Sequence, residues 1–450
     1  MPHNQPGMDL KLRILDRSAV VGVIGLGYVG LPLLAAFHRA GFPVLGFDTD
    51  PGKVEQLNRG HNYLRHLGET LVSDMLPPVS PAGRFGATVD TRRLGECDVI
   101  ISCVPTPLGR HLEPDLSYVQ KSADDIAATL RAGQLIVLES TTYPRTTREI
   151  LLPALERARG EFRCGRDFFL AFSPEREDPG RKDHTTRTIP KLVGGVNDAS
   201  TEIAALLYEQ AVDTVVKVSS AEVAEAAKLL ENIYRAVNIA LVNEMKVVLT
   251  AMGIDIWEVI AAAKTKPFGF QAFYPGPGLG GHCIPIDPYY LTWKAREVGQ
   301  STKFIELAGE INHAMPQYVI SRLTLALNDR GKSVRFAKVL IMGLAYKPDV
   351  DDVRESPSFE LIELLRELGA EVDYNDPHVP KTHKMRRYGD MGLASVELTP
   401  DSLRVYDCVL IATDHKLYDW QLVADHAQLI IDTRNALKHT TGRRDHIVHA

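Results

Sequence analysis

The stretch that decides the fold is Val20-Val-Gly-Val-Ile-Gly25-Leu-Gly27-Tyr-Val-Gly30, in which an apolar run leads directly into a GxGxxG motif. Val20 to Ile24 predicts a buried parallel strand, and Leu31 to Ala40 follows with helical apolar spacing. A second strand, Pro43 to Phe47, ends at Asp48. Strand, glycines, helix, strand and terminal acid in this order form the dinucleotide-binding fingerprint.

The three glycines of the motif have separate tasks. Gly25 makes the turn, Gly27 lets a pyrophosphate approach the backbone, and Gly30 lets the helix pack close to the strand. Asp48 should accept hydrogen bonds from the adenosine ribose and repel a 2′-phosphate, which favours NAD over NADP. The alternative is a glycine turn in an ordinary βα unit.

Further apolar strands each end in a polar cluster. Loops after parallel strands face the ligand crevice, so Thr106, Thr141 and Glu175 are candidate site residues. Thr141 and Glu175 fit equally well as a helix cap and a surface turn acid. Cys97 and Cys103 are interpreted as small core residues. The strands in question are Cys97–Val104, Leu135–Leu138 and Phe168–Phe172.

The same strand plan recurs after Phe336, but the glycine triplet is replaced by Ala345-Tyr346-Lys347. Lys347 and Arg354 suit a diphosphate bound by side chains, although both could instead pair with neighbouring acids on the surface. The sequence therefore predicts an α/β protein with two Rossmann-like doubly wound lobes joined by a long central helix. The expected domains are 1–215, 216–330 and 331–450. The repeated strands are Lys338–Ala345, Glu371–Pro377 and Tyr406–Thr413.

Ser219 to Gly253 has the longest helical pattern, of a length that typically bridges lobes or builds a subunit interface. Lys228 and Asn232 lie four residues apart on one face, where they could hold an oxyanion or a water molecule. The alternative is a solvated Lys–Asn pair, comparable with the surface ion pair expected between Glu231 and Arg235.

The loop from Tyr274 to Tyr290 holds one thiol, Cys283, and a carboxylate, Asp287. Its glycines permit unusual backbone dihedrals and its prolines stiffen it, which suits a loop that wraps a ligand in one shape. Cys283 is therefore predicted to be a nucleophile, with a buried structural cysteine as the alternative.

NAD together with a thiol nucleophile indicates oxidation at the aldehyde level. The thiolate adds to the aldehyde, hydride leaves to NAD, and water hydrolyses the resulting thioester to an acid. An alcohol substrate needs an earlier hydride transfer, for which Lys228 and Asn232 could polarise the oxygen. Glu175, Thr141 and Asp287 could position or activate water.

Composition narrows the class of protein. The chain has 450 residues, enough for two or three domains, with 45% hydrophobic and 24% charged residues. A net charge of -6 without a long basic run argues against nucleic acid as a partner. Neither a signal core in Met1–Asp16 nor a membrane span is found. Five scattered cysteines without metal-like spacing predict no metal and a reducing, cytoplasmic location.

These motifs resemble the UDP-glucose/GDP-mannose dehydrogenase family, and in particular its UDP-N-acetylglucosamine 6-dehydrogenase branch. The similarity covers nearly the whole chain, from Val20 to Ala436. It is carried by Glu139–Pro144, Ser173–Gly180, Gly276–Asp287, Gly343–Lys347 and Arg354–Pro357.

The resemblance implies a four-electron oxidation of a sugar's primary hydroxyl to a carboxylate with two NAD, for bacterial surface polysaccharides. It implies a UDP-sugar substrate and a homodimer or higher homo-oligomer built on the long helix, while the short apolar runs predict no membrane partner. Implied catalytic residues are Cys283, Lys228, Asn232, Glu175, Thr141 and Asp287. Implied NAD contacts are Gly25, Gly27, Tyr28, Val29, Gly30, Asp48, Lys53, Thr106 and Thr141. Implied substrate contacts are Glu175, Arg176, Lys228, Asn232, Tyr274, Gly280, Lys347 and Arg354.

Two departures from the UDP-glucose enzymes argue against that sugar. Ile286 stands where they usually carry Lys, and Arg176-Glu177 stands where they carry Phe-Leu. UDP-N-acetylglucosamine is the favoured substrate, while the galactosamine and mannosamine epimers and UDP-glucose stay as alternatives. Rival hypotheses are a single-hydride dehydrogenase with a structural Cys283 and a non-catalytic NAD-binding scaffold or sensor.

Overall fold

The computed structural model describes residues 6–64, 68, 70–81, 83–109, 113–176, 187–281, 284–385 and 388–450. The chain divides into two compact units. Unit 1 comprises Met1–Glu231 and Tyr289–Gln300, and unit 2 comprises Asn232–Pro288 and Ser301–Ala450. Within the described ranges, no helix combines the length and the apolar character needed to cross a membrane.

Unit 1 is built, in its described residues, on an eight-stranded sheet in the order β3-β2-β1-β4-β5-β6-β7-β8. All neighbours are parallel except β6 and β7. The first six positions follow the Rossmann order 3-2-1-4-5-6, in which the crevice lies where the order reverses, between β1 and β4. The strands are β1 (Val21–Ile24), β2 (Val44–Phe47), β3 (Phe85–Thr88), β4 (Val99–Ser102), β5 (Leu135–Leu138), β6 (Phe169–Phe172), β7 (Lys191–Gly195) and β8 (Val215–Lys217).

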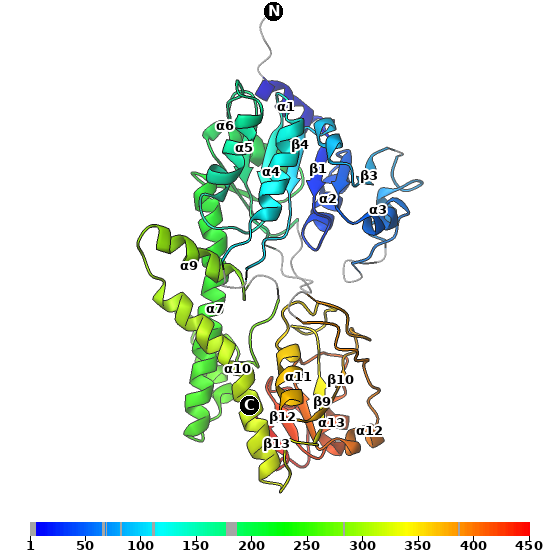
Figure 1. Ribbon diagram of the computed structural model, residues 1–450, viewed down its shortest axis with the longest axis vertical. Helices are drawn as coiled ribbons and strands as arrows, with labels where there is room; N and C mark the ends of the chain where they lie inside the picture. The colour runs from blue at the N-terminus through cyan, green and yellow to red at the C-terminus, as the bar shows by residue number, and fades with distance from the viewer. Residues whose placement is uncertain are drawn as a thin grey trace, which may run out of the picture. The chain divides into compact units, whose positions relative to one another are not determined.

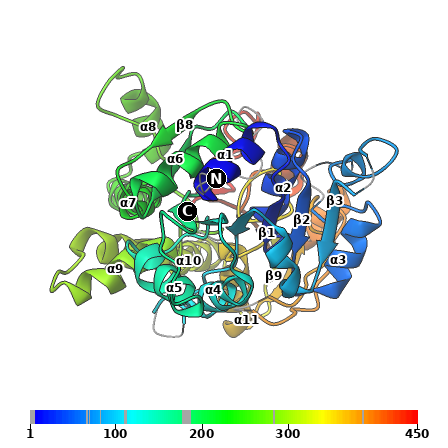
Figure 2. The same cartoon turned by 90° about the horizontal axis from the view of Figure 1, so that it is seen from above.

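Helices cover both faces of this sheet, as the alternation of buried residues along the strands requires. Val99 and Ile101 pack with α1, α2 and α6, whereas Ile100 packs with α4 and α5 on the opposite face (Figure 2). The doubly wound prediction for the first lobe is confirmed. The helices are α1 (Pro6–Leu15), α2 (Gly30–Arg39), α3 (Pro51–Asn58), α4 (Ser117–Thr129), α5 (Leu152–Ala158) and α6 (Asp198–Tyr208), with short turns η2 (Ser73–Met75), η3 (Thr91–Glu96) and η4 (Thr147–Leu151).

The expected long helix is α7 (Ala221–Ala251), with 31 residues and a length of about 46 Å at 1.5 Å per residue. Ser220 caps it by accepting a hydrogen bond from the Val223 amide. In unit 2, α7 packs against α10, where the buried Asn312 donates to the Ala236 carbonyl (Figure 1). The helices that follow α7 are α8 (Ile256–Lys264), α9 (Asp287–Glu297) and α10 (Lys303–Asn328).

Unit 2 contains, among its described residues, a five-stranded parallel sheet in the order β10-β9-β11-β12-β13. Counted within the lobe this is 2-1-3-4-5, the other common doubly wound order, and it reverses between β9 and β11. Helices α10 and α11 cover one face, and α12 and α13 cover the other. The second Rossmann-like lobe is confirmed. Its elements are β9 (Lys338–Met342), α11 (Pro357–Glu367), β10 (Glu371–Asn375), α12 (Pro400–Val405), β11 (Cys408–Ile411), α13 (Trp420–His426), β12 (Ile430–Asp432) and β13 (Ile447–His449).

Candidate active site

The glycine loop after β1 has the geometry that dinucleotide binding needs. Gly25 has φ +88°, and a Cβ there would lie 2.5 Å from the Cys103 carbonyl oxygen. A Cβ on Gly30 would lie 1.9 Å from the Gly25 carbonyl oxygen, so the start of α2 can approach β1 only with glycine. A Cβ on Gly27 would meet nothing within 4 Å, which leaves open space over that backbone. The loop therefore fits a pyrophosphate at the N-terminus of α2.

Asp48 follows β2 at the same edge and lies against this loop. Its Oδ2 accepts from the Leu26 amide at 3.0 Å, and its Oδ1 accepts from the Asp50 amide at 3.0 Å. Lys53 Nζ lies 3.9 Å from Oδ2. The carboxylate is fixed beside the glycine loop with a side-chain exposure of 10%, as a ribose-binding acid should be.

The remaining candidates near the NAD site lie in loops at the carboxyl end of the first sheet. Tyr28 and Val29 belong to the glycine loop, and Val29 occupies the N-cap position of α2. Thr106 is buried after β4, where the Tyr290 hydroxyl of α9 donates to its carbonyl. Thr141 is half-buried after β5. The chain segment that follows the thiol loop is thus attached to the first lobe through Tyr290.

Glu175, which follows β6, belongs to a buried charged cluster. The Lys191 ammonium lies 2.9 Å from the Glu139 carboxylate and 3.7 Å from that of Glu175. Tyr208 donates to the other oxygen of Glu139. Burial raises the pKa of Glu139, and Lys191 only partly offsets it. Burial opposes the charged form of Lys191 too, but Glu139 and Glu175 together raise its pKa, so the ammonium stays protonated. Sequence reasoning missed Lys191, because nothing near it in the chain marks it.

Arg176, predicted to contact substrate, forms an ion pair within unit 1. Its guanidinium lies 2.7 Å from Glu231 and donates to the Pro190 carbonyl at 2.7 Å. The expected pair between Glu231 and Arg235 is therefore wrong. A helical i,i+4 pair contributes only a few tenths of a kcal/mol, whereas Arg176 meets two acceptors at once.

Lys228 and Asn232 occupy consecutive turns of α7, and both are buried. In unit 2, Asn232 Nδ2 donates to Asp287 Oδ2 at 2.5 Å, and Asp287 is 2% exposed. The solvated Lys–Asn alternative is therefore wrong. The structure brings two of the predicted catalytic residues into direct contact, at the first residue of α9.

Cys283 lies outside the described residues, but most of its loop is described. Gly278 and Gly281 have φ +139° and +87°, values that favour glycine. A Cβ on Gly280 would lie 2.6 Å from the Tyr346 side chain, and the Gly281 amide donates to the Arg354 carbonyl at 2.9 Å. Within unit 2, the thiol loop therefore packs directly on the segment that carries Lys347 and Arg354.

The predicted substrate residues of unit 2 differ in their surroundings. Arg354 makes a bidentate pair with the buried Asp352, at 2.7 Å for the closest contact, so the ion-pair alternative describes it well. Lys347 is half-buried in the same segment. Tyr274 is 49% exposed and stacks on Trp257, with ring centroids 5.9 Å apart.

A buried cationic cluster beside the thiol loop was not predicted. Lys246 of α7 is 1% exposed, and its Nζ has no hydrogen-bond partner among the described residues. Burial lowers the pKa of Lys246 to about 7; repulsion from Arg434 and Arg322 adds to this shift, while attraction to Asp432 opposes it. A Cβ on Gly276 would lie 2.3 Å from Arg434, which places that guanidinium directly against the loop. Lys246 lies about four helical turns beyond Asn232, a spacing that a longer helical wheel would have revealed.

The described cysteines are all poor nucleophiles. Burial raises the pKa of Cys97 to about 12 and raises the pKa of Cys103, Cys164 and Cys408. A thiol needs its anionic form to attack, so these four remain inert. The core interpretation of Cys97 and Cys103 agrees with their burial, which is only partial for Cys103.

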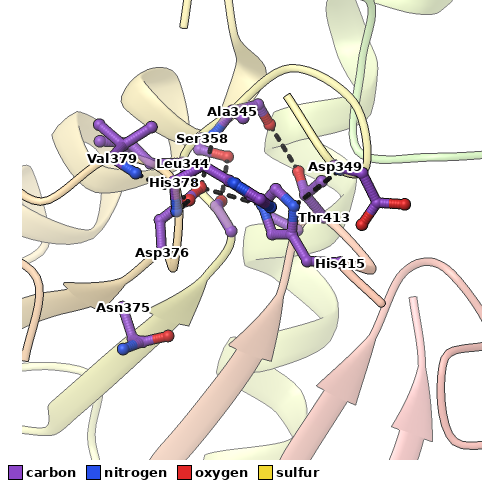
Figure 3. Close-up of polar contacts among 12 residues, drawn as sticks. Leu344, Ala345, Asp349, Ser358, Asn375, Asp376, His378, Val379, Thr413 and His415 are labelled. Atoms are coloured by element: carbon purple, nitrogen blue, oxygen red, sulfur yellow. Dashed lines mark hydrogen bonds and ion pairs between the residues drawn. The ribbon is translucent and has the colours of Figure 1, made fainter. Parts of the chain in front are cut away.

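The second lobe repeats the acid of the first but encloses it. Asp376, which follows β10, is 2% exposed (Figure 3). It accepts from the amides of Leu344 and Ala345 at 2.7 and 2.9 Å, and from His415 Nε2 at 3.0 Å. Its other oxygen accepts from two more backbone amides. A carboxylate with five internal donors has no capacity left for a ribose, in contrast to Asp48.

Comparison with known proteins agrees with this architecture. Three models of the UDP-glucose/GDP-mannose dehydrogenase family match: the NAD binding domain over residues 19–212, the central domain over 222–314 and the UDP binding domain over 340–439.

Individual proteins are similar over most of their length. The chain is 38% identical to a UDP-N-acetyl-D-glucosamine 6-dehydrogenase of Pseudomonas aeruginosa, over 88% of this chain and 90% of that protein. It is 34% identical to a UDP-N-acetyl-D-mannosamine dehydrogenase of Pyrococcus horikoshii, over 93% and 96%. The structure of a UDP-D-ManNAc dehydrogenase from Pyrococcus horikoshii superposes with a TM-score of 0.85 at 31% identity, covering 96% of this chain and 98% of that one.

The glycine loop, the fixed acid beside it and the three matching family models lead to one conclusion. The chain belongs to the UDP-glucose/GDP-mannose dehydrogenase family, whose members are NAD-dependent nucleotide-sugar 6-dehydrogenases.

Proposed function

We propose that this enzyme oxidises the 6-hydroxymethyl group of a UDP-N-acetylhexosamine, UDP-N-acetylglucosamine in the first place, to the uronic acid. The reaction consumes two NAD and one water, and passes through an aldehyde, a thiohemiacetal and a thioester on Cys283. The single observation that carries the proposal is the buried hydrogen bond between Asn232 and Asp287, because it joins two candidate catalytic residues, of which Asp287 lies four positions after that thiol.

The inert state of the other thiols supports Cys283 as the nucleophile. Cys97, Cys103, Cys164 and Cys408 are held protonated by burial, which leaves Cys283 as the remaining cysteine. Its loop combines glycines with positive φ and prolines, which suits a reactive group presented in one conformation.

Residues of both units supply the rest of the chemistry. A bound NAD, held by the glycine loop and Asp48, would supply the hydride acceptor. Lys228 polarises the sugar oxygen as charge develops on it, and Asn232, oriented by Asp287, donates a hydrogen bond to the same oxygen. Glu175, whose carboxylate lies 3.7 Å from the Lys191 ammonium, takes a proton from the hydrolytic water, and Thr141 positions that water.

The nucleotide of the substrate carries two phosphates, for which unit 2 offers cations. Lys347 and, beside its ion pair with Asp352, Arg354 bind the diphosphate from one segment, while Tyr274 and Gly280 line the loop that packs on it. The buried Arg434 adds positive charge against Gly276, and the buried Lys246 interacts electrostatically with Arg434. An anion bound here would relieve the repulsion between these cations, which favours a diphosphate over a neutral ligand.

The choice of sugar rests on sequence and on relatives. Ile286 and Arg176 depart from the UDP-glucose pattern, and the chain is 38% identical to a protein named UDP-N-acetyl-D-glucosamine 6-dehydrogenase. UDP-N-acetylmannosamine is the second candidate, because several similar proteins carry that name. UDP-N-acetylgalactosamine and UDP-glucose complete the set to be tested.

A panel of UDP-sugars and GDP-sugars, assayed for NADH yield with the product identified by mass, tests this function. We expect two NADH and one uronate per UDP-N-acetylglucosamine, and no uronate from Cys283→Ala. Cys283→Ser should stall at a covalent or aldehyde stage. Undiminished uronate from Cys283→Ala would reject the thiol mechanism, and one NADH per sugar would identify a single-hydride dehydrogenase. NAD binding without NADH from any sugar would identify a scaffold or sensor.

We also propose a homodimer or higher homo-oligomer, a cytoplasmic role in surface polysaccharide synthesis, and the domain division 1–215, 216–330 and 331–450. The oligomer is supported by exposed apolar side chains along α7. Light scattering on Leu241→Glu should show loss of the oligomer. These side chains are Tyr234, Leu241, Met245, Val248 and Met252.

A further inference from the structure

A closed polar network lies at the carboxyl edge of the second sheet, where β9, β10 and β11 end (Figure 3). Its centre is the contact between Asp376 and His415, both fully enclosed by protein. Burial opposes the charged form of Asp376, but His415 and the surrounding backbone amides hold its pKa below the usual value. The carboxylate is therefore ionised at neutral pH and can only accept hydrogen bonds.

This carboxylate fixes the tautomer of His415. Because Asp376 only accepts, the proton of the imidazole lies on Nε2, 3.0 Å from Oδ2. Nδ1 then carries a lone pair, which accepts from the Asp349 amide at 3.0 Å. The imidazole thus connects the end of β10 to the middle of the segment that follows β9.

The segment from Ala345 to Arg354 needs such support because its backbone is strained. Asp349 has φ +62°, a conformation that costs a non-glycine residue free energy. Thr413 Oγ1 donates to the Ala345 carbonyl at 2.7 Å and holds the start of the segment. Its middle is held by His415 and by the Lys416 amide, which donates to the Asp349 carboxylate at 2.9 Å.

A metal ion is the other chemistry that these side chains suggest. Ligand atoms of Asp349, His378 and His415 lie within 4.8 Å of one another, and two imidazoles with a carboxylate suit zinc. The lone pair of His415 Nδ1 is, however, already directed at the Asp349 amide. A metal on Nδ1 would have to displace that amide and leave it unpaired, so the geometry favours a hydrogen-bonded clamp.

We propose that His415 is a positioning residue for the substrate nucleotide. It holds the strained Ala345–Arg354 segment in the conformation that presents Lys347 to the diphosphate, and it touches no reacting atom. The inference rests on the proposed UDP-sugar function. It also explains why the acid of the second lobe is enclosed: Asp376 orients an imidazole instead of a ribose.

Two substitutions separate the two contacts of the imidazole. His415→Asn keeps an acceptor near the position of Nδ1 for the Asp349 amide, whereas His415→Gln keeps a donor near the position of Nε2 for Asp376. His383, an exposed histidine of the same lobe, provides the matched control His383→Gln. The measurements are kcat, KM for the UDP-sugar, KM for NAD, and calorimetric binding of UDP alone to the full-length enzyme.

We expect His415→Gln to raise KM for the UDP-sugar and Kd for UDP about tenfold, as loss of one buried hydrogen bond predicts. His415→Asn should show a smaller rise, and neither variant should change KM for NAD. A merely structural histidine would instead lower the melting temperature and kcat without separating the two KM values.

Unchanged KM and Kd values in both folded variants, or equal changes for sugar and NAD, would overturn the proposal. If His415→Gln does not fold, His415→Asn decides, because a KM for UDP-sugar above that of His383→Gln with an unaltered KM for NAD is still required. Failure of the proposed function is recognised separately, since the wild-type enzyme would then bind NAD and yield no NADH with any UDP-sugar.

Discussion

Replacing Lys246 by methionine tests whether the enzyme tolerates a buried positive charge for the sake of binding an anion. Methionine has nearly the same length and no charge, so the substitution removes the desolvation cost and keeps the volume. A pKa of about 7, against 10.5 for an ordinary lysine, means that holding the ammonium charged disfavours folding. At about 1.4 kcal/mol per pH unit, the full cost is about 5 kcal/mol.

The sign of the pH dependence follows from proton uptake. Because the pKa of Lys246 is lowered in the folded protein, the unfolded chain binds more protons between pH 7 and 10.5, and stability rises with pH in this window. The destabilisation of the folded protein by the Lys246 ammonium is at its full value below pH 7 and disappears as the pH approaches 10.5. Lys246→Met should therefore be more stable than wild type by up to about 5 kcal/mol at pH 6, with the difference vanishing near pH 10.5.

Urea denaturation of both proteins at pH 6, 8 and 10 measures this difference, and groups common to both cancel. Lys264→Met, at the exposed end of α8, is the matched control and should change stability by less than about 0.5 kcal/mol. Added UDP should stabilise wild type more than Lys246→Met. A variant less stable than wild type at pH 6 would refute the reasoning, because it would mean that the ammonium has a compensating partner.

Three further substitutions test the site. Gly30→Ala should reduce NAD affinity at least tenfold in a fluorescence titration, because its Cβ would lie 1.9 Å from the Gly25 carbonyl oxygen. Asn232→Asp would set two buried carboxylates about 2.5 Å apart, so kcat should fall at pH 8 and recover partly at lower pH in a pH–rate profile. Lys191→Met leaves the buried carboxylate of Glu139 without its cation, so the free energy of unfolding measured in urea should fall by about 3–5 kcal/mol.

Each of these substitutions has a matched control. Gly86→Ala, whose Cβ would meet only ordinary contacts, should leave NAD affinity intact, and equal losses in both glycine variants would contradict the steric argument. Asn238→Asp, on a different face of α7 from Asn232, should leave the pH dependence of kcat as it is in the wild type. Lys217→Met, an exposed ion-pair lysine, should change stability by less than about 0.5 kcal/mol, and the Lys191 argument fails if the two lysine variants behave alike.

Local chemistry made the first lobe predictable. The roles of Gly25, Gly27 and Gly30 depend on atoms within one βα unit, so the motif alone specified the turn, the open backbone and the close packing. Strand ends shifted by only a residue or two, as with β1, because hydrogen bonding and not apolar character sets where a strand begins. The repeat of this strand pattern was equally visible after Phe336.

Contacts between distant segments were not predictable in the same way. Lys191 meets Glu139 because β7 runs antiparallel to β6, so the first residue of β7 lies at the same end of the sheet as the residue that follows β5, and one sequence does not disclose that direction. Glu231 had a plausible partner four residues away, but its actual partner, Arg176, comes from a loop far back in the chain. His415 carried no signal at all, since its role exists only through two backbone segments brought together by folding.

The enclosed acid of the second lobe has a consequence for turnover. With Asp376 committed to internal donors, the lobe with the open acid is the one suited to take up the oxidised coenzyme. On the proposed stoichiometry, both hydride transfers must then take place one after the other at the same coenzyme-binding site. NADH has to dissociate and NAD has to bind while the half-oxidised sugar stays in the site. A covalent bond to sulfur, or binding of the uridine end, is then what prevents release of a reactive aldehyde.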